Sequence, residues 1–359
     1  MRGKAYIKNA KGIRRFDRIF AALLLTVSLL LSDTGTCMAA DTAEASQATE
    51  GAEIIQIATA EDLTELAEQC RNDWYSYGKV FSMAADIDVK GTGFQGIPYF
   101  NGTWEGNGYK ITGFTISRKG SDFGFFRYLG KNARIEDLTV EGSIHMEGSG
   151  ENVGGLVGVN FGLLSGCRFN GEISAAKSAG GIAGYNKADG RIVGCSAAGT
   201  VTATNGTGGI CGENKGIIKD CVNESTVNGE DLKTTLNLDG VDLGDLNLTQ
   251  NVVTRNDSGG IAGISSGTLS GCTNRGNVGY AHVGYNVGGI AGRQSGTVME
   301  CTNEGSILGR KDAGGIVGQA EPYMESEYLS DRLEKLQDDL GSMNSLVTVS
   351  YTHLTLPTI

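Results

Sequence analysis

The motif Gly-Gly-(Ile/Leu)-x-Gly occurs six times between residues 154 and 318, and it strongly limits what this chain can fold into. Successive copies begin 26, 28, 51, 29 and 26 residues apart, and the longest interval is one repeat plus an insertion of roughly residues 230–255. The motif glycines are Gly154, Gly155, Gly158, Gly180, Gly181, Gly184, Gly208, Gly209, Gly212, Gly259, Gly260, Gly263, Gly288, Gly289, Gly292, Gly314, Gly315 and Gly318. Such a repeat predicts a solenoid, because each unit is too small to bury its apolar face except against its neighbours.

Each repeat contains short β-rich runs, and none has the length or the 3.6-residue period of a helix. In the copy that starts at Gly288 we expect three strands, at residues 289–292, 297–301 and 306–308. Stacked coils at the strand spacing of ~4.8 Å would share one continuous core. The expected fold is all-β: a right-handed parallel β-helix solenoid, with a short N-terminal capping helix and a C-terminal helical segment.

The overall composition agrees with this fold. The chain has 56 glycines and only 3 prolines; glycine permits the positive φ that coil corners require, whereas proline removes a donor from the strand ladder. Collagen is excluded because proline and a strict three-residue period are lacking. Disorder is excluded because 40% of the residues are hydrophobic. The formal net charge of -11 excludes a nucleic-acid binder, which needs a basic face.

A cysteine follows the start of the motif by 13 residues in four repeats and by 15 in a fifth. These cysteines are Cys167, Cys195, Cys221, Cys272 and Cys301. A metal site is disfavoured because no Cys-x-x-Cys pair occurs. Disulfides are disfavoured because neighbouring positions on parallel strands suit their geometry poorly. We therefore expect a ladder of buried thiols, with Cys211 also in the core, and no cofactor.

Residues 53–147 are interpreted as less regular initial coils that include the capping helix. Ile54, Ile55 and Ile57 indicate a strand, and Thr59 followed by Asp62 fits the start of a helix. Such a helix would cover strand edges that otherwise invite aggregation. The run Phe123-Gly124-Phe125-Phe126 is expected to supply aromatic core.

The two ends of the chain differ from the repeats, which we place at residues 148–320. Residues 1–40 combine a basic segment, a short apolar run and small residues, which predicts a secretory signal peptide; an uncleaved signal anchor is the alternative. The apolar run is shorter than the ~20 residues of a membrane-spanning helix, so we expect no span in the mature chain. Residues 41–52 are interpreted as a flexible lead-in. Leucines spaced 4, 3 and 4 apart predict a helix within residues 321–346, and residues 347–359 are interpreted as a non-native tail of a chain that naturally continues.

Few residues in the sequence suggest chemistry. Asp239, Asp242 and Asp245 in the insertion are candidate Ca²⁺ ligands, although an Asp-Gly hairpin turn explains the same residues. Asp86, Asp88 and Asp137 are the acids considered for glycoside cleavage, but they gather on no repeated face. The chain's histidines are His145, His282 and His353, and no His-Glu-x-x-His motif is present, so we expect no peptidase site. No catalytic set is predicted.

The copies at 154–160 and 180–186 resemble the GLUG-motif repeats of bacterial surface proteins, over roughly residues 150–320. The resemblance implies a secreted or surface-attached protein, as an adhesin-like stalk or a non-catalytic part of a larger protein, some secreted metallopeptidases included. We therefore expect a secreted or cell-surface β-helix with a structural or adhesive role, and a host or cell-wall glycan or protein as partner. The alternatives are a carbohydrate-active β-helix enzyme (polysaccharide lyase or glycosidase) and the stalk of a larger metallopeptidase.

Overall fold

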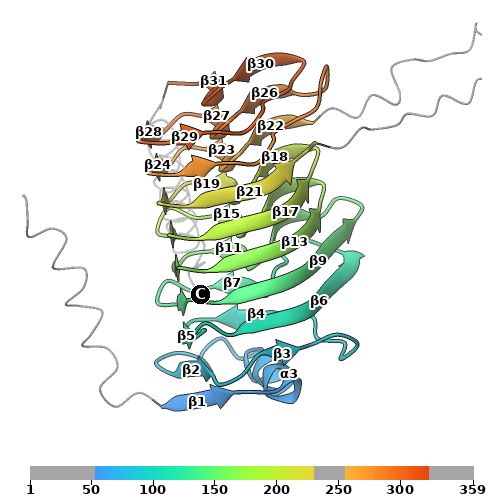
Figure 1. Cartoon of the computed structure of the whole chain (residues 1–359). Coiled ribbons are helices and arrows are strands. Elements are labelled where there is room, and N and C mark those ends of the chain that lie inside the picture. Colours follow the sequence, from blue (N-terminus) through green and yellow to red (C-terminus); the bar gives the residue numbers. More distant parts are fainter. Residues whose placement is uncertain (1–52, 230–254, 323–359) are drawn as a thin grey trace, which may run out of the picture. The chain divides into compact units, whose positions relative to one another are not determined.

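The computed structural model describes residues 53–229 and 255–322. Contacts group the chain into two units, Met1–Ile54 and Ile55–Ile359. The described residues form a parallel β-solenoid in which successive coils stack in the order of the sequence (Figure 1). The predicted all-β parallel β-helix is therefore confirmed. The predicted signal peptide, lead-in, C-terminal helix and tail, with the calcium candidates and His353, lie outside the described residues.

Four sheets run along the solenoid, and each takes one strand from successive coils. Sheet A consists of β1 (Ile54–Ile57), β2 (Val80–Met83), β5 (Thr103–Glu105), β8 (Arg134–Glu136), β12 (Leu163–Ser165), β16 (Arg191–Val193), β20 (Ile217–Lys219), β24 (Thr268–Ser270) and β28 (Thr297–Met299). Sheet B consists of β3 (Ile87–Asp88), β6 (Lys110–Lys119), β9 (Thr139–Glu147), β13 (Arg168–Ser174), β17 (Ser196–Thr202), β21 (Val222–Val227), β25 (Thr273–Asn274) and β29 (Thr302–Asn303). The neighbouring strands from β2 onward in sheet A, and throughout sheet B, pair in parallel.

The other two sheets meet at the glycine motif. Sheet C consists of β4 (Ile97–Phe100), β7 (Phe126–Leu129), β11 (Val157–Asn160), β15 (Ala183–Asn186), β19 (Cys211–Asn214), β23 (Ala262–Ser265), β27 (Ala291–Gln294) and β31 (Val317–Ala320). Sheet D, the shortest of the four, consists of β10 (Glu151–Gly154), β14 (Lys177–Gly180), β18 (Asn205–Gly208), β22 (Asn256–Gly259), β26 (Tyr285–Gly288) and β30 (Lys311–Gly314). Sheet D begins later in the sequence than the others, so the initial coils lack its strand.

The expectation of three strands per repeat needs correction. The motif does not form one strand: its first glycine ends a sheet D strand and the next two residues turn a corner into sheet C, as Gly288 and Ala291 show. Residues 306–308 form no named strand, only an isolated bridge between Val278 and Ile307. The motif's second glycine lies where a Cβ on Gly181 would collide with the carbonyl oxygen of Gly209 in the next coil. The motif therefore marks a corner packed backbone to backbone.

The second residue of every sheet D strand is in the left-handed αL region. These residues are Asn152, Ser178, Gly206, Asp257, Asn286 and Asp312, with φ between 50° and 66°. Asp122, at the same place one coil before β10, has a φ of 61°. Gly, Asn and Asp are the residues that adopt αL at least cost, which explains why the column is mostly these types.

Asparagine side chains form two ladders along the inside of the solenoid. Asn160, Asn186 and Asn214 end successive sheet C strands and are fully buried. The Nδ2 of each of the first two donates to the Oδ1 of the next at 2.8 Å. A second ladder, in sheet B, links Asn223, Asn274 and the half-buried Asn303 in the same way, at 2.8 and 2.7 Å. These bonds satisfy polar groups that would be costly to bury alone.

The core changes character along the solenoid. In the initial coils it is aromatic: Phe100, Trp104, Phe125 and Phe126 are fully buried, and the centroids of the Phe125 and Phe126 rings are 5.0 Å apart in an edge-to-face arrangement. The repeats bury smaller groups, among them the cysteines. The predicted aromatic core is present.

The helix α3 (Ala60–Gln69) lies at the end of the solenoid that holds the initial coils (Figure 1). As predicted, Thr59 is its N-cap and forms a capping box with Asp62. Leu63 and Leu66 are buried against the core, and Cys70 caps the helix C-terminus. The helix therefore contributes core side chains to the coils that it covers. Within residues 53–229 and 255–322, no helix has the length and apolar character needed to cross a bilayer.

The insertion does not disturb the stacking. β18 and β22 pair in register, with Asn205 opposite Asn256 and Gly208 opposite Gly259, although 51 residues separate the members of each pair. The described chain stops at Gly229 and resumes at Arg255. The coils before and after the insertion are therefore direct neighbours.

Candidate ligand site at the initial coils

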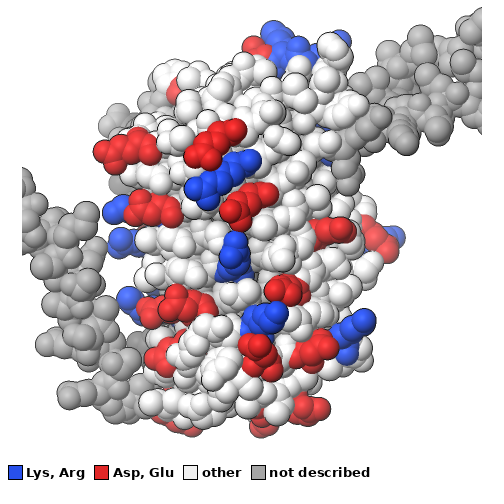
Figure 2. Space-filling model, in the orientation of Figure 1, with Lys and Arg blue, Asp and Glu red and all other residues white. Residues whose placement is uncertain are grey.

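The outer face of sheet B carries both signs of charge, interleaved along the solenoid (Figure 2). Arg168 pairs with Glu224 at 3.1 Å, and Arg275 lies 3.7 Å from Glu224 and 3.3 Å from Glu304. Such exposed pairs add little stability. They leave this face without a field of one sign that would attract a charged ligand.

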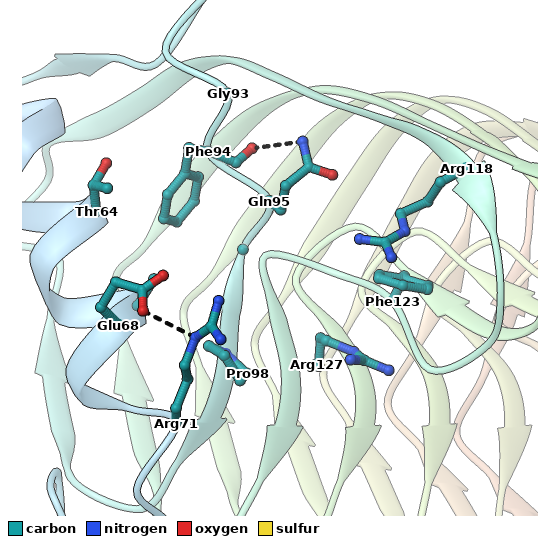
Figure 3. A pocket seen from close by; sticks show the side chains of 12 residues that line it. Thr64, Glu68, Arg71, Gly93, Phe94, Gln95, Pro98, Arg118, Phe123 and Arg127 are labelled. Atoms are coloured by element: carbon teal, nitrogen blue, oxygen red, sulfur yellow. Dashed lines mark hydrogen bonds and ion pairs between the residues drawn. The ribbon is translucent and has the colours of Figure 1, made fainter.

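A cavity of about 450 Å³ lies beside the initial coils, near the start of sheet D (Figure 3). Thr64 and Glu68 of α3 and Arg71 just after it form one wall. The loop of residues 93–96 and Pro98 in β4 form another, where Gly93 and Gly96 have positive φ. The third wall comes from Phe123, from Arg118 in β6 and from Arg127 in β7.

The third wall places two guanidinium groups against one ring. Arg118 and Arg127 lie over the Phe123 ring, with guanidinium carbons 5.1 and 4.5 Å from its centroid. Figure 3 shows the ring between the two side chains. Phe123 itself is buried, at 3% exposure. The faces of an aromatic ring carry partial negative charge and attract cations. The buried Phe123 ring therefore helps to position both guanidinium groups.

Arg127 also bonds to backbone groups at the place where sheet D has no further strand. Its Nε donates to the carbonyl oxygen of Asp122 at 3.1 Å and its Nη2 to that of Ser121 at 3.3 Å. The corresponding positions in the next coils are Gly158 and Gly184, where a Cβ would collide with the backbone of the neighbouring coil. The arginine fits because no sheet D strand passes beneath it. Its bonds occupy carbonyls at a sheet edge that would otherwise be open to another chain.

The charges in the cavity do not cancel. Arg71 pairs with Glu68 at 3.0 Å, and both side chains are well exposed. Arg118 and Arg127 form no ion pair with any carboxylate in the described part of the chain. The cavity wall thus presents two guanidinium groups without a carboxylate partner, in a chain whose formal net charge is -11. A planar guanidinium binds a carboxylate through two parallel hydrogen bonds, so the wall suits a carboxylate ligand.

The cysteine ladder has no access to solvent over most of its length. Cys167, Cys195, Cys221 and Cys272 are buried, Cys301 is half-buried, and all five are free thiols. The Sγ of each donates to the carbonyl two residues earlier, at 3.3 to 3.4 Å. Burial raises the pKa of the Cys167 thiol well above its usual range. Cys211 lies in sheet C opposite Ala183 and Ala262, at the place of a core residue.

The acids considered for glycoside cleavage bond to the backbone or stand at corners. Asp86 Oδ1 accepts from the Lys110 N–H and Asp88 Oδ1 from the Lys90 N–H, both at 2.9 Å. Asp137 lies at a corner with φ 51°. In residues 53–229 and 255–322, no three His, Cys, Asp or Glu side chains cluster in a way that would hold a metal ion.

The described histidines are exposed, in different settings. His145 is on strand β9, and its Nε2 lies 4.0 Å from Glu172 Oε2. His282 is in a turn with φ 63°. Neither lines the cavity.

Sequence reasoning missed the cavity. Its arginines lie outside the repeats, and nothing in their spacing links Arg71 to residues 47 and 56 positions later. The only signal in the sequence was the aromatic run at 123–126 with an arginine directly after it. The aromatic composition of that run indicated a place in the core and gave no reason to expect a ligand site.

Comparison with known proteins supports the repeat assignment. The family model described as the GLUG motif matches residues 175–202. This stretch begins just before β14 and ends with β17, so it spans one full turn through all four sheets. No solved structure matches the chain.

Two curated proteins are similar to parts of the chain. A "Putative Gly-rich membrane protein" of Evansella cellulosilytica is 36% identical over 99 residues, which cover 24% of this chain and 12% of that protein. "Halomucin" of Haloquadratum walsbyi is 28% identical over 134 residues, which cover 33% of this chain and 1% of that protein. The chain therefore spans a small part of the length of either relative. The chain therefore contains a GLUG motif, at residues 175–202, within a parallel β-solenoid.

Proposed function

We propose that this chain is a secreted or cell-surface β-solenoid with a structural and adhesive role. The observation that carries the proposal is the in-register stack of coils, in which the repeat residues serve as core, corners and ladders. A solenoid of this kind holds its ends apart and offers an extended surface for binding. The names of the two similar proteins, a Gly-rich membrane protein and halomucin, support a location at the cell surface.

As part of the same proposal, the chain acts by binding and not by catalysis. Asp86 and Asp88 are engaged as acceptors for backbone N–H groups, which is a structural use of a carboxylate. The purified full chain should release no reducing ends and no unsaturated product from pectins, alginates or host glycans. Turnover of any of these polymers would contradict this part of the proposal.

Surface location is tested on intact cells of the source organism. Antibodies against the chain should label unbroken cells or the medium, and an added protease should remove the cell-bound label while a cytosolic marker remains intact. In parallel, the purified full chain should bind to a cell-wall or host-glycan fraction and be retained after washing. Label that appears only after lysis would overturn the proposed location, and failure to bind every fraction would overturn the adhesive role.

A further inference from the structure

We infer that the cavity at the initial coils binds the carboxylate group of an acidic saccharide, such as a uronic acid unit. This inference rests on the adhesive part of the proposed function and names the chemistry of its ligand. The cavity volume of about 450 Å³ falls in the range of about 300–1,000 Å³ that is usual for small-molecule sites.

The anionic group is recognised by Arg118 and Arg127. Both guanidinium groups lie over the buried Phe123 ring, and Arg127 is further held by the carbonyls of Ser121 and Asp122. Neither needs to release a carboxylate partner in the described chain before it binds a ligand. Arg127 is pre-organised by two carbonyls and the ring, whereas Arg118 is oriented by the ring alone. Holding a binding group in place beforehand reduces the conformational entropy that is lost on binding.

The remaining lining fits a sugar better than a bare anion. Phe94 and Pro98 supply apolar surface, whereas Thr64, Gln95 and Glu68 supply hydroxyl, amide and carboxylate groups. Figure 3 shows these groups across the cavity from the two arginines. A uronic acid has this division: one carboxylate, several hydroxyls and an apolar ring face. A few polar groups set in an apolar wall fix the orientation of such a ligand.

The location also fits a saccharide at the end of a polymer. At the initial coils, sheet D extends beyond β10 only through an isolated bridge between Phe123 and Val153. The cavity lies just beyond this edge of the sheet. The cavity thus occupies the place of a sheet D strand that the initial coils lack. A chain end can bind there while the polymer extends into solvent.

The test is titration calorimetry of the purified full chain with oligogalacturonate, with the neutral galactose oligomer of the same length, and with sodium sulfate. We expect oligogalacturonate to bind, the neutral oligomer to bind at least tenfold more weakly, and sulfate to bind more weakly than oligogalacturonate. Affinity should fall as salt is raised, because the contact is ionic and exposed to solvent.

Two variants locate the binding. Arg118→Gln removes one guanidinium from an exposed side chain and should weaken binding at least tenfold, whereas Lys119→Gln removes the neighbouring cation, which does not line the cavity, and should change affinity less than twofold. Thermal melts should be alike for the two variants. The inference is overturned if oligogalacturonate does not bind, if the neutral oligomer or sulfate binds equally well, or if the two variants behave alike in binding. Glycan adhesion that survives Arg118→Gln would leave the proposed function standing and remove this site from it.

Discussion

Asn160 donates a hydrogen bond from Nδ2 to Oδ1 of Asn186 across 2.8 Å, one coil further along the solenoid. Asn186 in turn donates to Asn214 at the same distance, and all three side chains are fully buried. The middle residue therefore serves as donor to one neighbour and acceptor to the other. Its loss would remove one hydrogen bond from the neighbour on each side.

Replacing that middle residue with an apolar one of similar size should destabilise the solenoid. In Asn186→Leu, the Nδ2 of Asn160 loses an acceptor and the Oδ1 of Asn214 a donor; each buried group left without a partner costs about 1–3 kcal/mol. Urea unfolding followed by circular dichroism should show a lower midpoint. Asn132→Ala, at an exposed turn, is the control and should leave the midpoint nearly unchanged. Equal midpoints for the two variants would contradict a role for the ladder in stability.

The glycine motif can be tested with the same substitution at two copies. In Gly181→Ala the new methyl would collide with the carbonyl oxygen of Gly209 in the next coil. Gly315 holds the same motif place in the last described coil, where a Cβ meets nothing within 4 Å. We expect Gly181→Ala to lower the free energy of unfolding by about 1–3 kcal/mol, as overpacking does, and Gly315→Ala to have little effect. Similar losses in both would show that glycine is needed for some reason other than contact between coils.

The capping box of α3 should make the stability of the first coils depend on pH. The backbone N–H groups of Ala58 and Thr59 donate to Asp62 Oδ2 at 2.9 Å each, and the bond from Ala58 is the main cause that lowers the pKa of Asp62. Because the folded-state pKa is lowered, the carboxylate stabilises the fold at pH above its unfolded value of about 3.9 and loses that effect as the pH falls through the folded value.

Asp62→Ala should therefore cost about 1 kcal/mol at pH 7, as the loss of a capping interaction does, and less at pH 2. The rates of hydrogen exchange at the amides of Leu63 and Leu66, both in α3, measure this loss of stability most directly. Glu61→Ala, in the same first turn but outside the capping box, is the control. A difference between wild type and Asp62→Ala that persists unchanged at pH 2 would rule out the carboxylate as its origin.

The thiols of Cys70 and Cys167 should be inert in the native protein. Burial raises the pKa of Cys70 to about 12 and that of Cys167 well above the usual range, so little thiolate exists at pH 8. Native labelling with iodoacetamide, read by peptide mass spectrometry, should modify the half-buried Cys301 first among the described cysteines. All of them should react in urea. Native labelling of Cys167 as fast as in urea would mean that the core opens readily.

The sequence predicts the architecture well because the residues that the stacking requires recur at the same place in each repeat. A glycine that lies backbone to backbone with the next coil, such as Gly181, leaves no room for a side chain, so glycine recurs at this place of the motif. The five cysteines stand out for a similar reason, since each fills the same small space in the core. The helix start at Thr59 and Asp62 is predicted because capping is local.

Sheet D and the asparagine ladders were not predicted, for a different reason. The strands of sheet D have four residues each, one of them in αL. They show neither an alternation of polar and apolar residues nor an enrichment in β-branched ones, as β14 (Lys-Ser-Ala-Gly) illustrates. Asn160 and Asn186 look like ordinary turn residues until the stacking buries them.

The cavity was not predicted because Arg71, Arg118 and Arg127 come together only in three dimensions. Local constraints were visible in the sequence, whereas features made by stacking were not.

The unbroken register across the insertion makes this corner a natural place for variation. Because Asn205 and Asn256 are direct partners, the chain leaves one coil and joins the next without any adjustment of the sheets. Segments of other lengths and compositions can then be exchanged between Gly229 and Arg255 while selection on the core continues unchanged. The same corner offers protein engineers a graft position: a foreign peptide inserted there would be displayed from a scaffold that already tolerates an interruption.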